Sequence, residues 1–518
     1  MKKKNIVVSF AFNAHDSSVT VADDKHVLLV IEAERFFRQK RKLCASTHEM
    51  EMLILHALSI LNLNENDVSY WCGTAFENKF LPENKRTCSW IKEFDIRIFD
   101  NIVNFYAVNH HLAHASFFYG SGFDNAIIKS CDGGGDGLKH VVYYGQGNDI
   151  SLINQADIIK RFNGTFYDVV SSYIYGEDGQ EGKFMGLSGY GQIDDNFLNF
   201  FEDHCETLCN KAYYDPYGNP ELGWRLLNDL KLNKKNIDYS KVKSFAKSAQ
   251  YFFEEKQIES LKPYENLSDN LVLVGGSALN ILANTQIKKH TKFKNIYIPP
   301  CCDDTGQSLG ALLFFMNNKF NINPIVNYPF LGEGKGSTVI NDSCIEQVIS
   351  DLKNNKVVAW HYGKGEIGPR ALGHRSLLCA PFTIENRILV SEKIKKREYY
   401  RPVAPIILYE KQDDYFDFED YSPYMLFSTE CKSLCRENAP AVVHVDNSSR
   451  LQSISSDFDS SIYSILKAWY EVTTIPILIN TSLNAAGKPI NNTYEDTIDF
   501  VRDNSSVSIY FDGKKYLR

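Results

Sequence analysis

Short apolar runs alternate with polar turns over most of this chain, a pattern typical of strands separated by tight connections. In the first part of the chain these runs predict buried strands at residues 6–12, 19–22, 27–31, 126–130, 141–144, 271–274 and 295–300. Apolar helical patterns begin at residue 281 and span residues 308–315, and the polar segment 197–270 is mostly helical in pattern. The sequence therefore predicts an α/β protein.

Two of the predicted strands end in similar polar turns. Residues 13–18 follow the first strand, residues 132–137 follow the strand at 126–130, and an apolar run returns after each turn. Glycines let backbone N–H groups come close to an anion, and a turn aspartate can hold a cation or water. We therefore expect Gly133 and Gly134 to lie near a nucleotide's phosphates, although such a turn taken singly can also merely connect a hairpin. A strand, an Asp/Gly/Ser turn and a returning strand, present twice, resemble the layout of actin-like ATPase folds.

A third segment also indicates nucleotide binding. The strand predicted at 271–274 runs into Gly275 and Gly276, and a helical pattern begins after Asn280. A strand followed by two glycines and a helix is a common way to seat a nucleoside or phosphate near a helix N-terminus. Asp304 follows another predicted strand and precedes a helix, so it is well placed to face a cleft between lobes.

His110 and His114 are four residues apart in a segment whose neighbours suit a packed helix. On a helix this spacing places both imidazoles on one face, one turn apart. Two neutral imidazoles can bind one divalent metal when a carboxylate from elsewhere completes the site. The alternative is that one histidine is a hydrogen-bonded core residue and the other faces solvent.

The second part of the chain carries clustered cations. Residues 321–336, rich in proline and glycine, are typical of a linker, so we predict one domain at 1–330 and a second at 337–518. Strands are predicted at 356–360 and 476–479. Basic side chains beside glycines in segment 361–376 suit a small phosphorylated ligand. Four cations lie within segment 395–401, where a solvated helix end is the alternative interpretation.

Composition narrows the class of function. The net charge of −8 argues against a general binder of nucleic acid or anionic membranes, and no apolar run approaches the roughly 20 residues of a membrane span. The basic start of the chain lacks the small-residue cleavage site of a signal peptide. The twelve cysteines form no C-x-x-C pair. We therefore expect a cytoplasmic protein with reduced thiols.

Taken together, the motifs resemble the NodU/TobZ-type O-carbamoyltransferase family over nearly the whole chain. The matching segments, in order, are His15-Asp16-Ser17-Ser18, Glu32-Ala33-Glu34-Arg35-Phe36, residues 110–115, residues 181–187, residues 275–280, residues 368–376 and residues 480–484. The Gly-Pro-Arg-Ala-Leu-Gly run at 368–373 and the histidine pair are together highly specific. The chain departs from the family pattern at His374, Leu483 and Cys301-Cys302, none of which removes a proposed catalytic group.

The resemblance implies an N-terminal domain of the actin-like ATPase type, similar to the enzymes that make threonylcarbamoyladenosine in tRNA, and a C-terminal YrdC-like α/β domain. It also implies a reaction. The C-terminal domain would release carbamate from carbamoyl phosphate, ATP with Mg²⁺ would adenylate the carbamate, and the N-terminal domain would transfer the carbamoyl group to an acceptor hydroxyl. Adenylation supplies a good leaving group, and a closed path between the two sites would protect carbamate from decomposing in water.

The same resemblance assigns roles by position. His110, His114, Asp132 and Asp304 match the family's metal site, commonly iron, with Asp303 as the neighbour that an alignment could confuse with Asp304. His15 could be the general base, and Lys40 could contact the activated intermediate. Gly275, Gly276 and Asn280 would seat the adenosine. The residues that would hold carbamoyl phosphate and the ATP phosphates are Lys395, Arg397, Arg401, Arg450, Ser482 and Asn484, with Arg370 and Arg375 as further candidates.

Three functions compete at this point. The first is an ATP-dependent O-carbamoyltransferase acting on a small molecule or glycan. The second is a threonylcarbamoyl transferase that modifies tRNA, against which the net negative charge argues. The third is a non-catalytic relative of actin folds, against which the retained histidines, acids and cations argue. The sequence identifies neither the acceptor nor the oligomeric state.

Overall fold

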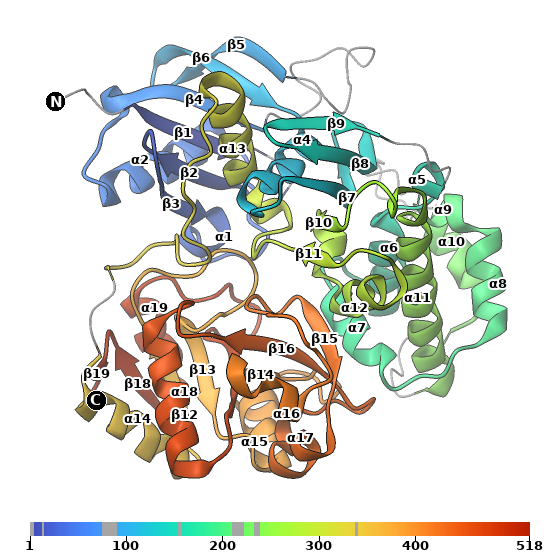
Figure 1. The fold of residues 1–518 in the computed structure, drawn as a ribbon, viewed down its shortest axis with the longest axis vertical. Helices are drawn as coiled ribbons and strands as arrows, with labels where there is room; N and C mark the ends of the chain where they lie inside the picture. Colours follow the sequence, from blue (N-terminus) through green and yellow to red (C-terminus); the bar gives the residue numbers. More distant parts are fainter. Residues whose placement is uncertain are drawn as a thin grey trace.

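The computed structural model describes residues 5–12, 15–74, 91–153, 158–209, 222–232, 239–336 and 340–517. Figure 1 shows two sheets and a group of helices in its upper half, coloured blue to yellow, and a third sheet below them, coloured orange to red. None of the helices in these ranges is long and apolar enough to cross a membrane.

The first sheet has six strands in the order β3-β2-β1-β4-β6-β5. Strands β1, β2 and β3 are antiparallel neighbours, whereas β4 runs parallel to β1 and β6 runs parallel to β4. The strands are β1 Ile6–Ala11, β2 Ser18–Ala22, β3 Val27–Glu32, β4 Val68–Thr74, β5 Ile91–Ile98 and β6 Asn101–Val108. Helices α1 (Ala33–Phe36) and α2 (Thr47–Ile60) follow β3.

The second sheet repeats this topology in the order β11-β10-β7-β8-β9. Its antiparallel strands β7, β8 and β9 correspond to β1, β2 and β3, and its parallel strands β10 and β11 correspond to β4 and β6. The bounds are β7 Asn125–Gly135, β8 Leu138–Gln146, β9 Asp149–Leu152, β10 Asn270–Val274 and β11 Asn295–Tyr297. The N-terminal part therefore has the duplicated layout predicted for an actin-like ATPase fold.

One detail of the prediction was wrong. The second glycine-rich turn was expected to begin at residue 132, but β7 continues through Gly135 and the turn contains only Asp136 and Gly137, both with positive φ. The ladder between β7 and β8 is irregular between Cys131 and Gly135, so this stretch bends while it stays in the sheet.

Helices α4 and α13 join the two sheets at their common core. Helix α4 (His110–Ala115) follows β6, and α13 (Gln307–Phe320) packs against α4, β1 and β4. Leu112, Leu309 and Leu312 are buried there among strand residues of both sheets. Burial of this apolar surface holds the end of β7 and the start of α13 against α4, which is where the candidate site forms.

A separate helical group lies beside the second sheet, on the right of Figure 1. Its helices are α5 Ile158–Arg161, α6 Thr165–Tyr175, α7 Glu181–Ser188, α8 Asp195–Asp203, α9 Cys205–Cys209, α10 Leu222–Asn228, α11 Ser240–Glu259 and α12 Ile281–His290. Buried aromatic residues of α6, α8 and α11 form its core.

The third sheet is mixed, with eight strands in the order β15-β16-β14-β17-β13-β12-β18-β19. Its strands are β12 Val357–His361, β13 Arg375–Cys379, β14 Ala404–Leu408, β15 Phe427–Glu430, β16 Ser448–Ile454, β17 Ile477–Ser482, β18 Val507–Phe511 and β19 Lys514–Lys515. The accompanying helices are α14 Asp342–Lys353, α15 Ile384–Ile388, α16 Gln412–Tyr415, α17 Ser433–Asn438, α18 Ser460–Thr473 and α19 Tyr494–Arg502.

The segment predicted as a linker is packed along the first sheet. Ile325 forms a bridge with His26, and the amide of Val30 donates to the carbonyl of Leu331 at 2.9 Å. Gly332 then donates to the carbonyl of Gly365 in the C-terminal part at 2.8 Å. The predicted start of the second domain at residue 337 lies outside the described residues, so the domain boundary stays a prediction.

Candidate active site

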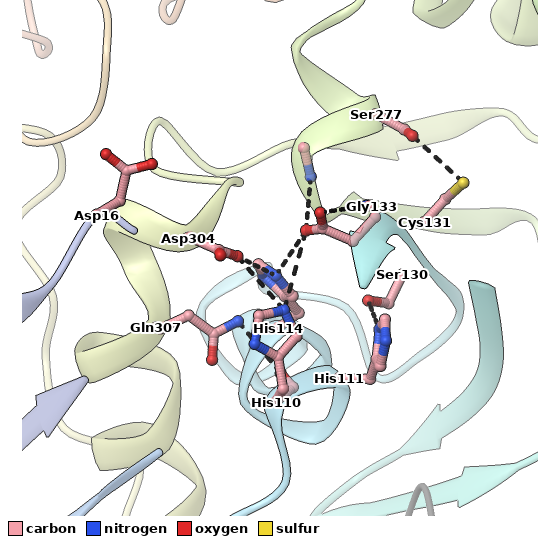
Figure 2. A network of polar contacts seen from close by, with 12 residues as sticks. Asp16, His110, His111, His114, Ser130, Cys131, Gly133, Ser277, Asp304 and Gln307 are labelled. Atoms are coloured by element: carbon pink, nitrogen blue, oxygen red, sulfur yellow. Dashed lines mark hydrogen bonds and ion pairs between the residues drawn. The ribbon is translucent and has the colours of Figure 1, made fainter. Parts of the chain in front are cut away.

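The histidine pair lies on a short buried helix, as predicted. Asn109 caps α4, because its side chain accepts hydrogen bonds from the amides of His111 and Leu112. The rings of His110 and His114 lie 4.8 Å apart, and Figure 2 shows both on the side of the helix that faces Asp304. His111 points elsewhere and shares a 2.8 Å hydrogen bond with Ser130.

Two carboxylates meet this histidine pair. The Nε2 atom of His114 lies 3.2 Å from Asp132 Oδ2 and 3.3 Å from Asp304 Oδ1. The Nε2 atom of His110 lies 3.4 Å from Asp304 Oδ1 and 4.0 Å from Asp132 Oδ2. The candidate ligand atoms of all four residues lie within 4.8 Å of one another. We call these four residues the metal cluster.

The metal cluster fits a divalent cation. Within the described part of the chain, the buried Nε2 atoms of both histidines and Oδ1 of Asp304 lie 3.2–3.4 Å from atoms of the cluster, but none of them forms a hydrogen bond of normal geometry. Buried polar atoms are rarely left unpaired, and two imidazoles with two carboxylates are a common donor set for zinc, iron and other transition metals. The cluster could therefore hold a metal ion, whose identity the residues alone do not define.

The charged groups of the metal cluster also shift one another's pKa values. Burial by itself would lower the pKa of His114, but Asp132 and Asp304 outweigh it and raise this pKa to about 9. The pKa of Asp132 lies well below its ordinary value, because the two histidines outweigh the effect of burial. By contrast, burial lowers the pKa of His111 to about 3, so His111 is neutral.

The predicted glycines support the metal cluster directly. The amides of Gly133 and Gly276 donate to the two oxygens of Asp132, at 2.5 Å and 3.0 Å. A Cβ atom at Gly135 would lie 2.3 Å from the ring of His110. A Cβ atom at Gly134 would meet no other atom within 4 Å. The glycine run thus orients a carboxylate, a role that the sequence reasoning did not anticipate.

The backbone of Gly275 and the side chain of Asn280 are fixed by contacts within the protein. Gly275 has a φ of 85°, and a Cβ atom there would lie 2.4 Å from the carbonyl oxygen of Cys131. Asn280 caps α12, and its side-chain amide exchanges hydrogen bonds of 3.0 Å and 3.1 Å with that of Gln250. These contacts fix the segment that was predicted to seat adenosine, although the Asn280 side chain already has protein partners.

The structure distinguishes the roles of the adjacent residues Asp303 and Asp304. Asp304 belongs to the metal cluster, whereas Asp303 accepts a hydrogen bond of 2.5 Å from the hydroxyl of Thr305 and lies outside it. Burial, together with the charge of Asp16, raises the pKa of Asp303 to about 7.

His15 lies next to the metal cluster. Its Nδ1 atom is 2.8 Å from Asp16 Oδ2 and 3.7 Å from Asp304 Oδ2. Burial by itself would lower the pKa of His15, but Asp16 and Asp304 raise it to about 9. The imidazole is therefore cationic at neutral pH in the metal-free protein and suited to an anion. A general-base role requires that it lose this proton.

The predicted phosphate-binding cations converge in the C-terminal part. Lys395 follows a π-helical turn at 389–394 and is only 3% exposed, so the interpretation of this segment as a solvated helix end is wrong for Lys395. Its ammonium donates to the carbonyls of Ser482 and Asn484 at 2.6 Å and 2.7 Å, and also to the side-chain oxygen of Asn484. Arg397 donates to the hydroxyl of Ser482 at 3.5 Å.

Further cations surround these residues. The charge of Arg401 acts on the pKa values of five other basic side chains, and we call these six residues the cation cluster: Lys40, Arg370, Lys395, Arg397, Arg401 and Arg450. Burial and the neighbouring Arg401 and Arg370 lower the pKa of Arg397 to about 9. The buried Nε atoms of Arg370 and Arg450 have no hydrogen-bond partner among the described residues. Such a cluster suits a polyanion.

Arg375 does not belong with these cations. Its guanidinium is buried and donates to backbone carbonyls, including those of Tyr362 at 2.8 Å and Glu333 at 3.0 Å. It therefore holds the linker segment against the C-terminal sheet. Its buried Nε atom has no partner among the described residues, and its phosphate-binding role stays a prediction.

Lys40 and Arg370 bring the two clusters together. Lys40 comes from the N-terminal part, yet Arg401, Arg397 and Arg370 all act on its pKa. The positive charge of Arg370 is in turn felt by Cys302 and Asp303, the residues immediately before Asp304. The cation cluster and the metal cluster thus adjoin at the contact between the two parts of the chain.

Comparisons with known proteins identify a family for this chain. Residues 73–313 match the family described as Carbamoyltransferase N-terminus, and residues 349–514 match Carbamoyltransferase C-terminus. The chain is 31% identical over 508 residues to an uncharacterized protein of Methanocaldococcus jannaschii, covering 94% of this chain and 95% of that protein. It is 26% identical to Nodulation protein NolNO of Sinorhizobium fredii (93% of this chain, 76% of the relative) and 26% identical to Nodulation protein U of the same organism (92% and 93%). The protein is therefore a member of the carbamoyltransferase enzyme family and a distant relative of these nodulation proteins.

Proposed function

We propose that the protein is an ATP-dependent O-carbamoyltransferase that forms carbamoyl-adenylate and transfers its carbamoyl group to a hydroxyl of a small molecule or glycan. The observation that carries this proposal is the position of the cation cluster directly beside the metal cluster. Two adjoining sites, one for polyanions and one for a cation, suit a reaction in which one nucleotide-linked intermediate is made and then used.

The cation cluster suits the first half of the reaction. The charged groups that act on the pKa of Lys395 are Arg397, Lys40 and Arg401, all of them cations. A phosphate group would relieve this repulsion and accept the unpaired Nε–H groups. We infer that these residues bind carbamoyl phosphate and ATP. There, carbamoyl phosphate is hydrolysed to carbamate and phosphate, and a carbamate oxygen attacks the α-phosphorus of ATP as pyrophosphate leaves.

The metal cluster suits the second half. A divalent cation there, which we propose to be Fe(II), would supply positive charge beside the nucleotide's phosphate. We infer that Gly133, Gly134, Gly275 and Gly276 border the nucleotide. A cation at the metal cluster would offset the charge of Asp304, which helps to raise the pKa of His15, and we infer that the neutral His15 then takes the proton of the acceptor hydroxyl as it attacks the carbamoyl carbon and AMP leaves. We also propose that residues 337–518 form a YrdC-like domain, that ATP enters with Mg²⁺, and that the protein acts in the cytoplasm.

Pyrophosphate exchange into ATP tests the first half of this proposal. Exchange that depends on carbamoyl phosphate is expected in the wild-type protein, and it should disappear in the Arg450→Ala variant, which removes a buried cation of the cluster. The matched control is Arg502→Ala, which removes an exposed arginine paired with Asp499 on α19. Absence of carbamoyl-phosphate-dependent exchange in the wild type would overturn the proposal.

A screen of hydroxyl-bearing acceptors for the gain of one carbamoyl group, read by mass spectrometry, tests the second half. The screen includes an arm with unmodified tRNA, threonine and bicarbonate. Modification of tRNA and of no sugar or small molecule would instead support the threonylcarbamoyl transferase hypothesis.

A further inference from the structure

A buried ion pair in the N-terminal part forms hydrogen bonds with a loop of the C-terminal part. Glu32 ends β3 and Arg35 lies on α1, with their side chains 3% and 6% exposed, and Arg35 Nε donates to Glu32 Oε2 at 2.8 Å. The pair binds both polar backbone groups of Gly368. The amide of Gly368 donates to Glu32 Oε1 at 2.6 Å, and Arg35 Nη2 donates to the carbonyl of Gly368 at 2.6 Å.

Gly368 is also confined on its other side. It has a φ of 86°, and a Cβ atom there would lie 2.1 Å from the carbonyl oxygen of Pro300 and 3.2 Å from Cα of Cys301. Only glycine permits so close an approach with this backbone conformation. Gly368 is therefore wedged between the ion pair and residues 300–301, which lead directly to Asp304 of the metal cluster.

Arg370 follows two residues later, where the two clusters adjoin. Its charge acts on Cys302 and Asp303 on one side and on Arg397, Arg401 and Arg450 on the other. Its buried Nε atom has no partner among the described residues, so a bound molecule can still receive this hydrogen bond. Because Arg370 follows Gly368 by only two residues, the position of Arg370 depends on how firmly residue 368 is held.

We propose that the Glu32–Arg35 pair is a positioning device, which holds residues 368–370 so that the buried guanidinium of Arg370 stays between the cation cluster and the metal cluster and helps to retain the carbamoyl-adenylate there. This inference rests on the proposed function. It gives a role to the Glu32–Arg35 pair, which takes no direct part in the proposed reaction. Burying two charges is costly, and replacing such a pair by apolar residues is often neutral or stabilising. A positioning role explains why a costly buried ion pair is present at this site.

The experiment compares two activities that respond differently to leakage of the intermediate. Without an acceptor, a retained intermediate blocks further turnover, whereas an intermediate that escapes decays in water and allows more ATP to be converted to AMP. In Arg35→Met and Glu32→Gln we therefore expect AMP release from ATP and carbamoyl phosphate, without acceptor, to rise about 10-fold, because small displacements of positioning groups have large effects. Pyrophosphate exchange should fall far less than in Arg450→Ala, because these variants loosen Arg370 without removing a cation of the cluster.

Two further variants and a hydrogen-exchange measurement complete the experiment. Arg35→Lys, which keeps the charge, should restore part of the retention. Arg97→Met, which removes an exposed ion pair of the same i,i+3 spacing between Arg97 and Asp100, should change neither activity. Hydrogen exchange should become faster in peptides that cover residues 366–373 in the Arg35→Met protein, and should stay unchanged in the Arg97→Met protein.

The outcomes separate the inference from the proposed function. Equal losses of AMP release and pyrophosphate exchange in both variants, or unchanged hydrogen exchange over residues 366–373, would overturn the positioning role while leaving the proposed function intact. Absence of carbamoyl-phosphate-dependent exchange in the wild type would overturn the proposed function and the retention role with it. Faster AMP release with preserved exchange would support both.

Discussion

Metal binding at the His110–His114 cluster should depend steeply on pH. In the metal-free protein, Asp132 and Asp304 raise the pKa of His114 to about 9, so the imidazole carries a proton at neutral pH. A metal ion can bind this nitrogen only after that proton has left. Metal affinity should therefore rise as pH increases from 7 to 9, and level off above 9.

The size of the effect follows from the pKa of His114. Between pH 7 and pH 9 the competing proton weakens binding by about 10-fold per pH unit, so we expect an affinity roughly 100-fold lower at pH 7 than at pH 9. Replacing His114 by alanine removes this proton and also one of the four donor groups. The variant should bind metal at least about 100-fold more weakly than the wild type at pH 9, which exceeds the usual effect of residues that only support a metal ligand.

Calorimetric titration of the apo-protein with Co²⁺ as a stable probe tests this reasoning. Runs in two buffers of different ionisation enthalpy count the protons released. At pH 7 we expect about one proton from His114 and a further contribution from His110, whose pKa Asp304 and Asp132 raise against the effect of burial. The matched control is His111→Asn, because His111 is neutral and makes its hydrogen bond to Ser130. Affinity that does not change with pH, or full metal occupancy in His114→Ala, would refute the assignment of these residues as ligands.

Three other substitutions test separate parts of the protein. Arg397→Ala should abolish pyrophosphate exchange, because water cannot replace a guanidinium contact to phosphate, yet this variant should still carbamoylate the acceptor when carbamoyl-adenylate is supplied. His15→Ala should lower carbamoyl transfer about 100-fold, the size expected for a general base, and leave pyrophosphate exchange nearly unchanged; loss of exchange would contradict this role. Gly368→Ala should cost about 2 kcal/mol of stability or more, seen as a lower melting temperature by calorimetry, because of its φ and its contact with Pro300, whereas Gly182→Ala, with open space around it, should be tolerated.

Local patterns along the chain were enough to predict nine of the nineteen strands in the described residues. Apolar runs marked β1, β2, β3 and β10 to within two residues, because strand burial depends mainly on consecutive side chains. The four-residue spacing of the histidines was also sufficient to place both imidazoles on one face of α4, since helix geometry is local. The end of β7 was missed, because continued pairing with β8 outweighed the turn preference of its glycines.

The sequence by itself determined which chemical groups this protein carries, but only the tertiary structure decided which of them meet. Arg370 and Arg375 occur in the same basic run, yet Arg370 belongs to the cation cluster and Arg375 donates to backbone carbonyls. Asp303 and Asp304 are neighbours, yet only Asp304 joins the metal cluster. Such choices depend on burial and on contacts between segments hundreds of residues apart, because a side chain's charge state and partners are set by the atoms packed around it rather than by its neighbours in the chain.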